Sequence, residues 1–265
     1  MSAIDYSGKV VIITGSSSGI GQAASILFAK LGASVTIHGR SEDGLKKTED
    51  LILEAGIPKE RIHSVKGSVT DSEVQKALID ETIKTFGRID ILINNAGGVK
   101  DDEKNQRSMA ALDYCLDVNL KAPIALTELA IPHLEKTKGN IVNVSSIASH
   151  KTHSSNPFYA VAKAGLDHFA RNYAAILAPS GIRINNLNPG ATDTAIFTRV
   201  GFPPEMIGKL KQFYTDLIPM NRWGTPEEMA EFLAFMASEK ASYMTGQIIN
   251  VDGGICVHSP SMKFD

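Results

Sequence analysis

The chain of 265 residues is long enough for one large domain or two small ones, and its 43% hydrophobic content is ample for a packed core. The formal net charge is -2 and no run of five like charges occurs, so the charge pattern gives no support for a nucleic-acid or anionic-membrane partner. These features favour a globular protein that acts on small molecules.

The first residues suggest no export signal. The segment Met1 to Gly8 is polar, and the apolar run that follows it is too short for a signal peptide or a membrane span. We therefore expect a cytosolic, cytoplasmic protein.

Cysteine and histidine spacing predicts neither a disulfide framework nor a metal site. Cys115 and Cys256 lie far apart without a C-x-x-C spacing, and both are expected to be buried thiols. His150 and His153 are spaced as H-x-x-H, but the loop Ser149 to Asn156 offers no third ligand at helical spacing. We expect these histidines to face solvent or substrate.

Apolar, β-branched runs alternate with helix-length segments along the chain. Seven runs are expected to be strands: Lys9 to Thr14, Ser34 to His38, Ile62 to Lys66, Ile89 to Asn94, Asn140 to Ser145, Arg183 to Leu187 and Gln247 to Val251. Such runs are typical of strands buried on both faces and joined by parallel crossovers. The sequence thus predicts an α/β class, doubly wound Rossmann fold with a seven-stranded parallel sheet flanked by helices on both faces, in a single domain over 1–265.

One long segment interrupts this alternation. Residues 192–225 are rich in Phe, Met and Pro where a short connection is expected, and such insertions after strands are typical of substrate lids or walls. Directly after it, Thr225-Pro226 is followed by Glu227 and Glu228. This pattern predicts a helix start whose acids complement the helix dipole, not a catalytic pair.

A glycine-rich turn follows the first predicted strand and leads into a helical pattern. Gly15 permits a tight turn, Gly19 allows close approach of the main chain to a pyrophosphate, and Gly21 allows the helix to pack on the strand. A flexible turn is the alternative. Because a strand and a helix flank the glycines, we expect a dinucleotide phosphate site at the helix N-terminus.

Tyr159 and Lys163 stand four residues apart after Pro157, so both side chains are expected on one helical face. Ser146 lies thirteen residues before Tyr159, at the end of a predicted strand, where open α/β sheets bind ligands. Ser145 competes for this role, but strand alternation turns it to the opposite side. Taken singly, Ser146 could be a helix N-cap or turn residue, Tyr159 a surface aromatic and Lys163 a solvated charge. These separate interpretations do not explain why all three residues occur together.

Together these motifs resemble the short-chain dehydrogenase/reductase family. The features that carry the resemblance occur in family order and cover about Lys9 to Gly254: Thr14-Gly15-x-x-x-Gly19-Ile20-Gly21, Asn94-Asn95-Ala96-Gly97, Asn119, Ser146, Tyr159-x-x-x-Lys163, Pro189-Gly190 with Thr194, and Val251-Asp252-Gly253-Gly254.

The resemblance implies a reaction and a role for each catalytic residue. Hydride from the nicotinamide ring would reach a carbonyl carbon while Tyr159 donates a proton to the oxygen that Ser146 holds. Lys163 would favour the phenolate and bind the nicotinamide ribose, and Asn119 would position a water. A second group of residues would contact the cofactor: Gly15, Ser17, Ser18, Gly19, Ile20, Gly21, Arg40, Ser68, Val69, Asn95, Ala96, Gly97, Tyr159, Lys163, Pro189, Gly190, Thr192 and Thr194.

The end of the second predicted strand indicates which nicotinamide is bound. The family's acidic position is Gly39 here, and Arg40 follows it, which suits a 2′-phosphate through charge-assisted hydrogen bonds. Ser17 or Ser18 would add contacts, and Ser68 or backbone atoms would meet the adenine. We therefore expect NADP(H), with NAD(H) as the less favoured cofactor and a solvated arginine as the plain alternative.

The leading hypothesis is a carbonyl reductase or alcohol dehydrogenase that uses NADP(H). NAD-linked alcohol oxidation and a non-catalytic nucleotide-binding scaffold are the alternatives. A small carbonyl or alcohol is the expected substrate, and a homodimer or homotetramer is the expected assembly. Six side chains suggest a partly apolar substrate pocket: Phe158, Phe197, Phe202, Met206, Phe213 and Trp223.

Overall fold

The computed structural model describes residues 3–100, 105–194 and 204–258. Its centre is a parallel sheet of seven strands in the order β3-β2-β1-β4-β5-β6-β7, which confirms the predicted fold class. The strands are β1 (Val10–Ile13), β2 (Ser34–Gly39), β3 (Ile62–Lys66), β4 (Ile91–Asn94), β5 (Asn140–Val144), β6 (Arg183–Pro189) and β7 (Ile248–Val251). Each expected strand is present, with bounds within two residues of the prediction.

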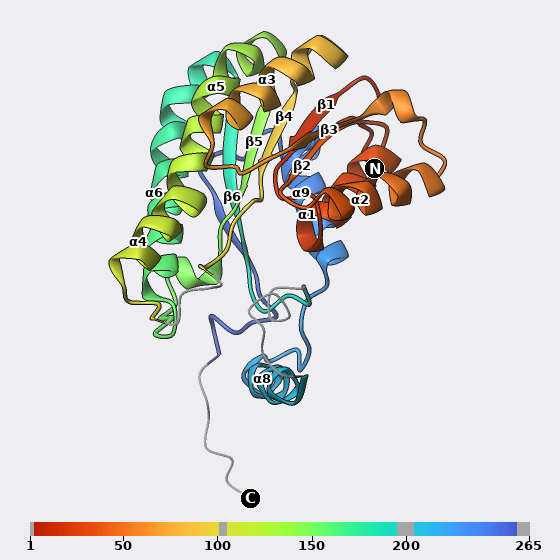
Figure 1. The fold of residues 1–265 in the computed structure, drawn as a ribbon. Helices are drawn as coiled ribbons and strands as arrows, with labels where there is room; N and C mark the ends of the chain where they lie inside the picture. The colour runs from red at the N-terminus through yellow and green to blue at the C-terminus, as the bar shows by residue number, and fades with distance from the viewer. Residues whose placement is uncertain (1–2, 101–104, 195–203, 259–265) are drawn as a thin grey trace, which may run out of the picture.

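Helices cover both faces of the sheet (Figure 1). Helices α3, α5 and α6 lie on one face, and α1, α2 and α9 lie on the other. The helices are α1 (Gly19–Lys30), α2 (Glu42–Glu54), α3 (Ser72–Phe86), α4 (Met109–Leu116), α5 (Ala122–Thr137), α6 (Pro157–Leu177), α8 (Pro204–Leu217) and α9 (Pro226–Ala237). Short helical turns are η1 (Lys59–Arg61), η2 (Asp117–Lys121), η3 (Ile147–Ser149), η4 (Ala178–Ser180) and η5 (Glu239–Ala241).

The core forms two layers because the central strands are apolar on both faces. All residues of β1 are buried, and alternate positions point to opposite sides of the sheet. Ile13 and Val11 pack with Phe28 of α1, whereas Ile12 packs with Leu126 of α5. Burial on both faces removes each strand from water, and this burial drives the strands and helices together.

Side chains of the expected types begin several helices. The Thr225 hydroxyl accepts from the amide of Glu228, and the Glu228 carboxylate accepts from the amide of Thr225, which makes a capping box for α9. This geometry confirms that Thr225 to Glu228 start a helix. Helix α3 begins with Asp71 as its cap, and Gly87 ends it in the left-handed region.

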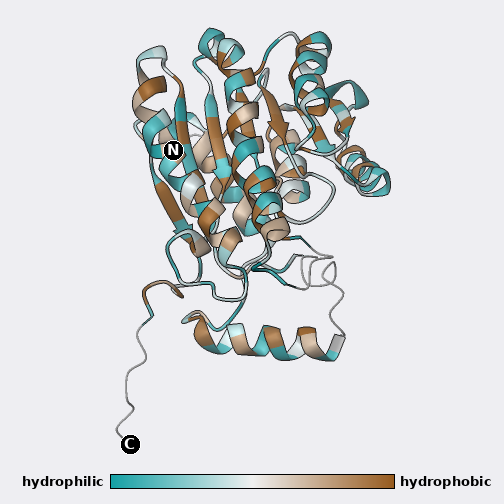
Figure 2. Cartoon of the chain, turned by 60° about the vertical axis from the view of Figure 1, so that its left-hand side comes forward, coloured by the Kyte–Doolittle hydropathy of each residue, from teal (hydrophilic) through white to brown (hydrophobic). Residues whose placement is uncertain are grey.

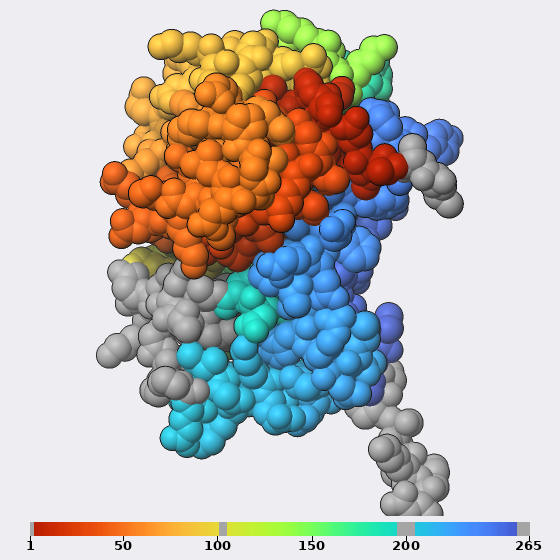
Figure 3. Space-filling model, turned by 90° about the vertical axis from the view of Figure 1, so that its right-hand side faces the viewer, coloured from red at the N-terminus to blue at the C-terminus, as the bar shows by residue number. Residues whose placement is uncertain are grey.

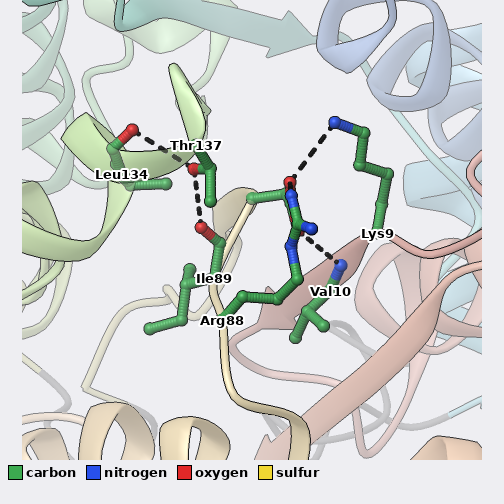
Figure 4. A network of polar contacts seen from close by, with 7 residues as sticks. Lys9, Val10, Arg88, Ile89, Leu134 and Thr137 are labelled. Carbon is green, nitrogen blue, oxygen red and sulfur yellow. Dashed lines mark hydrogen bonds and ion pairs between the residues drawn. The ribbon is translucent and has the colours of Figure 1, made fainter.

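A polar network fastens the amino ends of β1 and β4, at the end of the sheet away from the ligand cleft described below. Figure 4 shows Lys9 and Arg88 converging there, with Thr137 of α5 bonded nearby to Ile89. The buried carboxylate of Asp90 accepts from Arg88 Nε at 2.8 Å and Nη2 at 2.6 Å, and it lies 3.3 Å from Lys9 Nζ. It also accepts from the amide of Val10 at 3.0 Å.

The predicted 192–225 segment contains α8, which stands apart from the sheet (Figure 1). Hydrophobic and hydrophilic residues alternate along α8 (Figure 2), and in the space-filling view its residues form the lower end of the molecule (Figure 3). Residues 195–203 lie outside the described part of the chain. Within that part, none of the helices combines the length and the apolar character needed to cross a membrane.

Candidate active site

A cleft of about 1710 Å³ lies at the carboxyl ends of the strands. Eighteen of the predicted site residues line it: Gly15, Ser17, Ser18, Gly19, Ile20, Arg40, Ser68, Val69, Asn95, Ala96, Gly97, Ser146, Tyr159, Lys163, Pro189, Gly190, Thr192 and Thr194. Gly21 and Asn119 are the two predicted residues that do not line the cleft. The parallel sheet brings the others together because all its strands end at the same edge.

The glycine turn has the conformation that its sequence predicts. Gly15 has φ +70°, and a Cβ on it would lie 2.9 Å from the Cα of Ala96 and from Nδ2 of Asn95. Gly19 has φ +58°, also in the left-handed region. Helix α1 then begins without a side-chain capping bond from Ser18, so the first amides of the helix face the cleft without a side-chain cap.

Gly21 acts behind the cleft, as a packing position. A Cβ there would lie 2.4 Å from the carbonyl oxygen of Gly15 and 2.4 Å from Nδ2 of Asn95. Asn95 in turn donates from Nδ2 to the Thr14 carbonyl at 2.8 Å, and the Thr14 hydroxyl accepts from the amide of Ala96 at 2.9 Å. These contacts lock the glycine turn to the end of β4.

The end of β2 presents a cation to the cleft where a carboxylate would stand in many NAD sites. A Cβ on Gly39 would lie 3.0 Å from both Cβ and Oγ of Ser17, so Ser17 occupies the space of a side chain there. Arg40 is exposed at the cleft and makes no ion pair with the described residues. The nearby Glu42 is instead paired with Lys66 at 2.6 Å.

Two further residues border this end of the cleft. Ser68 Oγ lies 2.8 Å from Thr70 Oγ1, and the carbonyl of Val69 accepts from Gln75 Nε2 at 2.7 Å.

The sequence interpretation missed His38, which lines the cleft and is 2% exposed. Burial lowers the pKa of His38 to about 4, so its ring is neutral at pH 7.

Tyr159 and Ser146 form the centre of the site. The Ser146 side chain interacts with the Tyr159 hydroxyl and lowers its pKa, and the Ser146 hydroxyl accepts from the amide of Ala148 at 3.1 Å. The competing Ser145 instead donates from Oγ to the carbonyl of Lys163 at 3.3 Å. Ser146 is therefore the serine that contacts the phenol.

The expected lowering of the Tyr159 pKa by Lys163 is wrong for this structure. Burial raises the pKa of Tyr159 to about 12, the bond from Ser146 opposes that rise, and Lys163 is not among the groups that shift it. The amino group of Lys163 lies 5.6 Å from the centre of the Tyr159 ring. Loss of solvation therefore sets the pKa of Tyr159, and the phenol is neutral at pH 7.

Lys163 is 3% exposed, and its Nζ donates to the carbonyl oxygen of Val144 at 2.7 Å. Burial lowers its pKa to about 8, against the opposing charges of Asp167 and Cys115. The Lys163 ammonium also borders Gly97, because a Cβ on Gly97 would lie 3.2 Å from Nζ. The amine is thus poised to gain or lose a proton near neutral pH.

Asn119 lies in η2, a single turn of π-helix between α4 and α5. Its Oδ1 accepts from the amide of Gly98 at 2.9 Å, and its Nδ2 donates to the Gly98 carbonyl at 2.8 Å and to the Cys115 carbonyl at 3.0 Å. Asn119 Oδ1 would lie 2.9 Å from a Cβ on Gly97. Asn119 therefore stands behind Gly97, on the side of Lys163, and holds the loop after β4.

The loop after β6 crosses the cleft toward the glycine turn. The Thr192 hydroxyl donates to the Gly190 carbonyl at 3.1 Å, and Thr192 forms a parallel bridge with Gly224. Thr194 packs beside Gly19, because a Cβ on Gly19 would lie 3.2 Å from Thr194 Cγ2. The loop after Pro189 thus joins the cleft wall to the segment that follows α8.

The far side of the cleft has one apolar and one polar wall. The apolar wall consists of Leu210, Phe213, Tyr214, Leu217 and Trp223, and the polar wall includes Gln106, Lys151, Thr152, His153, Ser154 and Asn156. Of the apolar residues expected here, Phe213 and Trp223 line the cleft and Phe158 and Met206 do not. Phe197 and Phe202 lie outside the described residues.

Thiols and histidines give no sign of a metal centre in residues 3–100, 105–194 and 204–258, where no cluster of metal-ligating side chains occurs. Both cysteines are free. Cys115 is buried as expected, whereas Cys256 is only partly buried, which corrects the expectation for that thiol. His153 borders Tyr159 edge-on at 6.4 Å between ring centres and faces the cleft.

Comparison with known proteins places this geometry in a class. Residues 15–256 match the family model described as enoyl-(acyl carrier protein) reductase. A 3-oxoacyl-[acyl-carrier-protein] reductase from Thermotoga maritima is 36% identical over 252 residues, which cover 94% of this chain and 98% of the relative. These matches define an oxidoreductase that acts on CH–OH or C=O groups with a nicotinamide cofactor.

Solved structures agree with the class. A short-chain dehydrogenase/reductase of unknown function from Caenorhabditis elegans, solved with cofactor, has a TM-score of 0.91 and 39% identity and covers 95% of this chain and 96% of that one. A 7α-hydroxysteroid dehydrogenase in complex with NADH and 7-oxo glycochenodeoxycholic acid has a TM-score of 0.86 and 32% identity, with coverage of 94% and 95%. The chain belongs to the short-chain dehydrogenase/reductase family.

Proposed function

We propose that this chain is an NADP(H)-dependent carbonyl reductase in which Tyr159 is the general acid. The observation that carries the proposal is that the interacting side chains of Ser146 and Tyr159 line the same cleft as the glycine turn at Gly15. A proton donor and a dinucleotide site then share one cavity, as carbonyl reduction requires.

The proton step follows from the ionisation of the two central groups. Tyr159 has a pKa of about 12, so it is a neutral phenol that can donate its proton to a carbonyl oxygen. Ser146 donates a second hydrogen bond to the developing negative charge. Lys163, with a pKa of about 8, is the nearby group that can supply a proton to the phenolate. A bound nicotinamide cofactor supplies the two electrons of the reaction as hydride.

Four features of the cleft support a dinucleotide at its glycine end. The turn at Gly15 has no room for a Cβ, and the Ser18 side chain makes no capping bond at the start of α1. Arg40 presents a guanidinium without an ion-pair partner among the described residues, which suits a 2′-phosphate through charge-assisted bonds, and Ser17 fills the position of an acid. Together these features favour NADP(H) over NAD(H).

NAD-linked alcohol oxidation is the second candidate. The relative that acts on 7α-hydroxysteroids was solved with NADH, which favours this candidate. In oxidation Tyr159 would accept the alcohol proton, and its pKa of about 12 makes the neutral phenol a poor base at pH 7. The Arg40 guanidinium therefore favours NADP(H) over the NAD of this candidate, and the neutral phenol is the form that donates a proton in reduction.

The two walls suit a substrate with an apolar body and a polar end. Phe213, Leu217 and Trp223 offer apolar area, and the polar wall offers hydrogen bonds from side chains such as His153 and Asn156. The names of the relatives include a 3-oxoacyl and a steroid substrate, which are both of this kind. Homodimeric or homotetrameric assembly and a cytoplasmic location stay predictions from the sequence.

The test of the proposal uses both cofactors and both directions. Consumption of NADPH and of NADH is measured across a graded panel of ketones, 3-oxoacyl thioesters and sugars, and formation of both is measured with the matching alcohols. We expect NADPH consumption with at least one apolar ketone at a kcat/KM at least about 10-fold above that with NADH. Alcohol oxidation with NAD that is faster than carbonyl reduction with NADPH would support the second candidate. Inactivity with every combination of cofactor and substrate would support a non-catalytic scaffold.

A further inference from the structure

One buried carboxylate near the site has no part in the proposed chemistry. Asp167 follows Lys163 by one turn of α6 and is 5% exposed. It does not line the cleft. Because burying a carboxylate is costly unless hydrogen bonds replace its water, the partners of Asp167 indicate what it does.

Both carboxylate oxygens of Asp167 accept from amides in β6. Oδ1 accepts from Nδ2 of Asn186 at 2.8 Å, and Oδ2 accepts from Nδ2 of Asn188 at 2.9 Å. A carboxylate accepts at both ends, whereas an amide of the same shape would turn one N–H₂ group toward another. The position therefore requires Asp and not Asn.

The Asn188 amide extends this contact to the turn that carries Ser146. Its Nδ2 lies 3.0 Å from the Ser146 carbonyl oxygen and 2.9 Å from Ser149 Oγ. Its Oδ1 has no hydrogen-bond partner among the described residues. Turning the amide over would place that oxygen against the oxygens of Asp167 and Ser146, so the orientation of the amide is fixed.

The same network reaches the centre of the sheet. Asn143 Nδ2 of β5 donates to Asn186 Oδ1 at 2.8 Å, and Asn94 Nδ2 of β4 donates to Asn143 Oδ1 at 2.9 Å. Every amide in this series donates in the direction of Asp167. Helix α6 is thereby fastened to three strands through buried hydrogen bonds.

We propose that Asp167 is a positioning residue: through the Asn188 amide, its carboxylate holds helix α6, which carries Tyr159, in register with the turn that carries Ser146. The inference rests on the proposed function. Ser146 and Tyr159 line the cleft from these two elements and interact there, so a relative shift would move the two side chains apart. A misplacement of about 1 Å can slow a reaction on the order of 100-fold.

Asp167 also acts on Lys163, which gives the proposal a second readout. The Asp167 charge raises the pKa of Lys163 against the effect of burial, and Cys115 of α4 acts in the same direction. Removing the carboxylate therefore lowers the pKa of Lys163. Removing the Asn188 amide leaves this charge in place.

A double-mutant cycle between Asp167→Asn and Ser146→Ala tests the proposal, with kcat for the best carbonyl substrate as the readout. We expect Asp167→Asn to lower kcat on the order of 10- to 100-fold in the natural protein but less than about 3-fold beside Ser146→Ala. The kcat-against-pH profile should shift to lower pH in Asp167→Asn and not in Asn188→Ser. An equal loss of kcat in both backgrounds would overturn the proposal.

A second variant and a control keep the result separate from folding. Asn188→Ser removes the hydrogen bond to the Ser146 carbonyl. It replaces Asp167→Asn in the double-mutant cycle if Asp167→Asn does not fold. Asn140→Ser is the matched control. Asn140 is also a buried amide, but it lies at the other end of β5 and its Nδ2 donates to the carbonyl oxygen of Met236 at 3.3 Å. Its kcat should be unchanged. If the natural protein is inactive, the proposed function is overturned. If it is active but Asp167→Asn and Ser146→Ala lower kcat independently, only this inference is overturned.

Discussion

The amino group of Lys163 donates to the carbonyl oxygen of Val144 at 2.7 Å, so the last residue of β5 holds the amine inside the protein. Burial lowers the pKa of Lys163 from 10.5 to about 8. The unfolded chain therefore binds more protons than the folded one between pH 8 and pH 10.5, and the stability contributed by this group rises with pH through that window.

A change of Lys163 to Met should remove this dependence on pH. From pH 7.5 to pH 10, the free energy of unfolding of the natural protein should rise relative to the Lys163→Met variant by on the order of 2 kcal/mol. Urea unfolding of both proteins at the two pH values measures the difference. Lys121→Met, at an exposed position, is the control and should track the natural protein. A difference that stays constant with pH would contradict the burial of the amine.

Removal of the Arg40 guanidinium should weaken NADPH and spare NADH. Arg40→Ala is expected to raise the Kd of NADPH at least about 10-fold, since a charge-assisted bond to a phosphate is worth roughly 1.5 kcal/mol or more. Fluorescence titration with both reduced cofactors measures it. Lys47→Ala removes a charge from α2 outside the cleft and should leave both constants unchanged. If Arg40→Ala binds NADPH as tightly as the natural protein does, the cofactor assignment is wrong.

An acid at position 39 needs space that Ser17 now fills. Gly39→Asp alone should weaken both cofactors, because its Cβ would lie 3.0 Å from Ser17. Adding Ser17→Gly frees this space, so the double variant should bind NADH more tightly than Gly39→Asp does, by on the order of 10-fold. Titration of the two variants with NADH decides the matter. If both variants bind NADH with equal affinity, Ser17 does not limit the space for an acidic side chain at position 39.

Asp90 should affect stability and not catalysis. Its carboxylate holds Arg88, Lys9 and the amide of Val10 at the opposite end of the sheet from the cleft. Asp90→Ala should lower the free energy of unfolding by about 2 kcal/mol, because it leaves the buried amide of Val10 without its acceptor, whereas Lys9 and Arg88 stay partly in water. Asp80→Ala breaks an exposed pair with Lys76 and should cost less than about 1 kcal/mol. A loss of kcat in folded Asp90→Ala would contradict the conclusion that Asp90 acts only at the end of the sheet away from the cleft.

Sequence patterns located most of this molecule for physical reasons. Buried parallel strands are continuously apolar, so each of the seven runs could be found and each ended within two residues of its prediction. The cleft residues could be predicted for a related reason. Gly15, Ser146 and Pro189 all stand where strands end, and a parallel sheet gathers those ends at one edge.

Features that depend on tertiary surroundings could not be predicted from the sequence. The pKa of Tyr159 rises because its burial outweighs the interaction with Ser146, and burial of a single phenol is not visible in a pattern. The bonds between Asp167 and Asn188 join residues of two elements with no motif in common. Asn119 was identified by resemblance, but its place behind Gly97 follows from a turn of π-helix that no local signal marks.

The central claim is that the Tyr159 hydroxyl delivers the proton during carbonyl reduction. The most direct measurement is the kcat of NADPH oxidation by Tyr159→Phe with the best ketone, beside its Kd for NADPH. The account predicts a loss of kcat of at least about 100-fold with a Kd within about 2-fold of the natural value, because only the proton donor is removed. A variant that kept more than about a tenth of the natural kcat would contradict it.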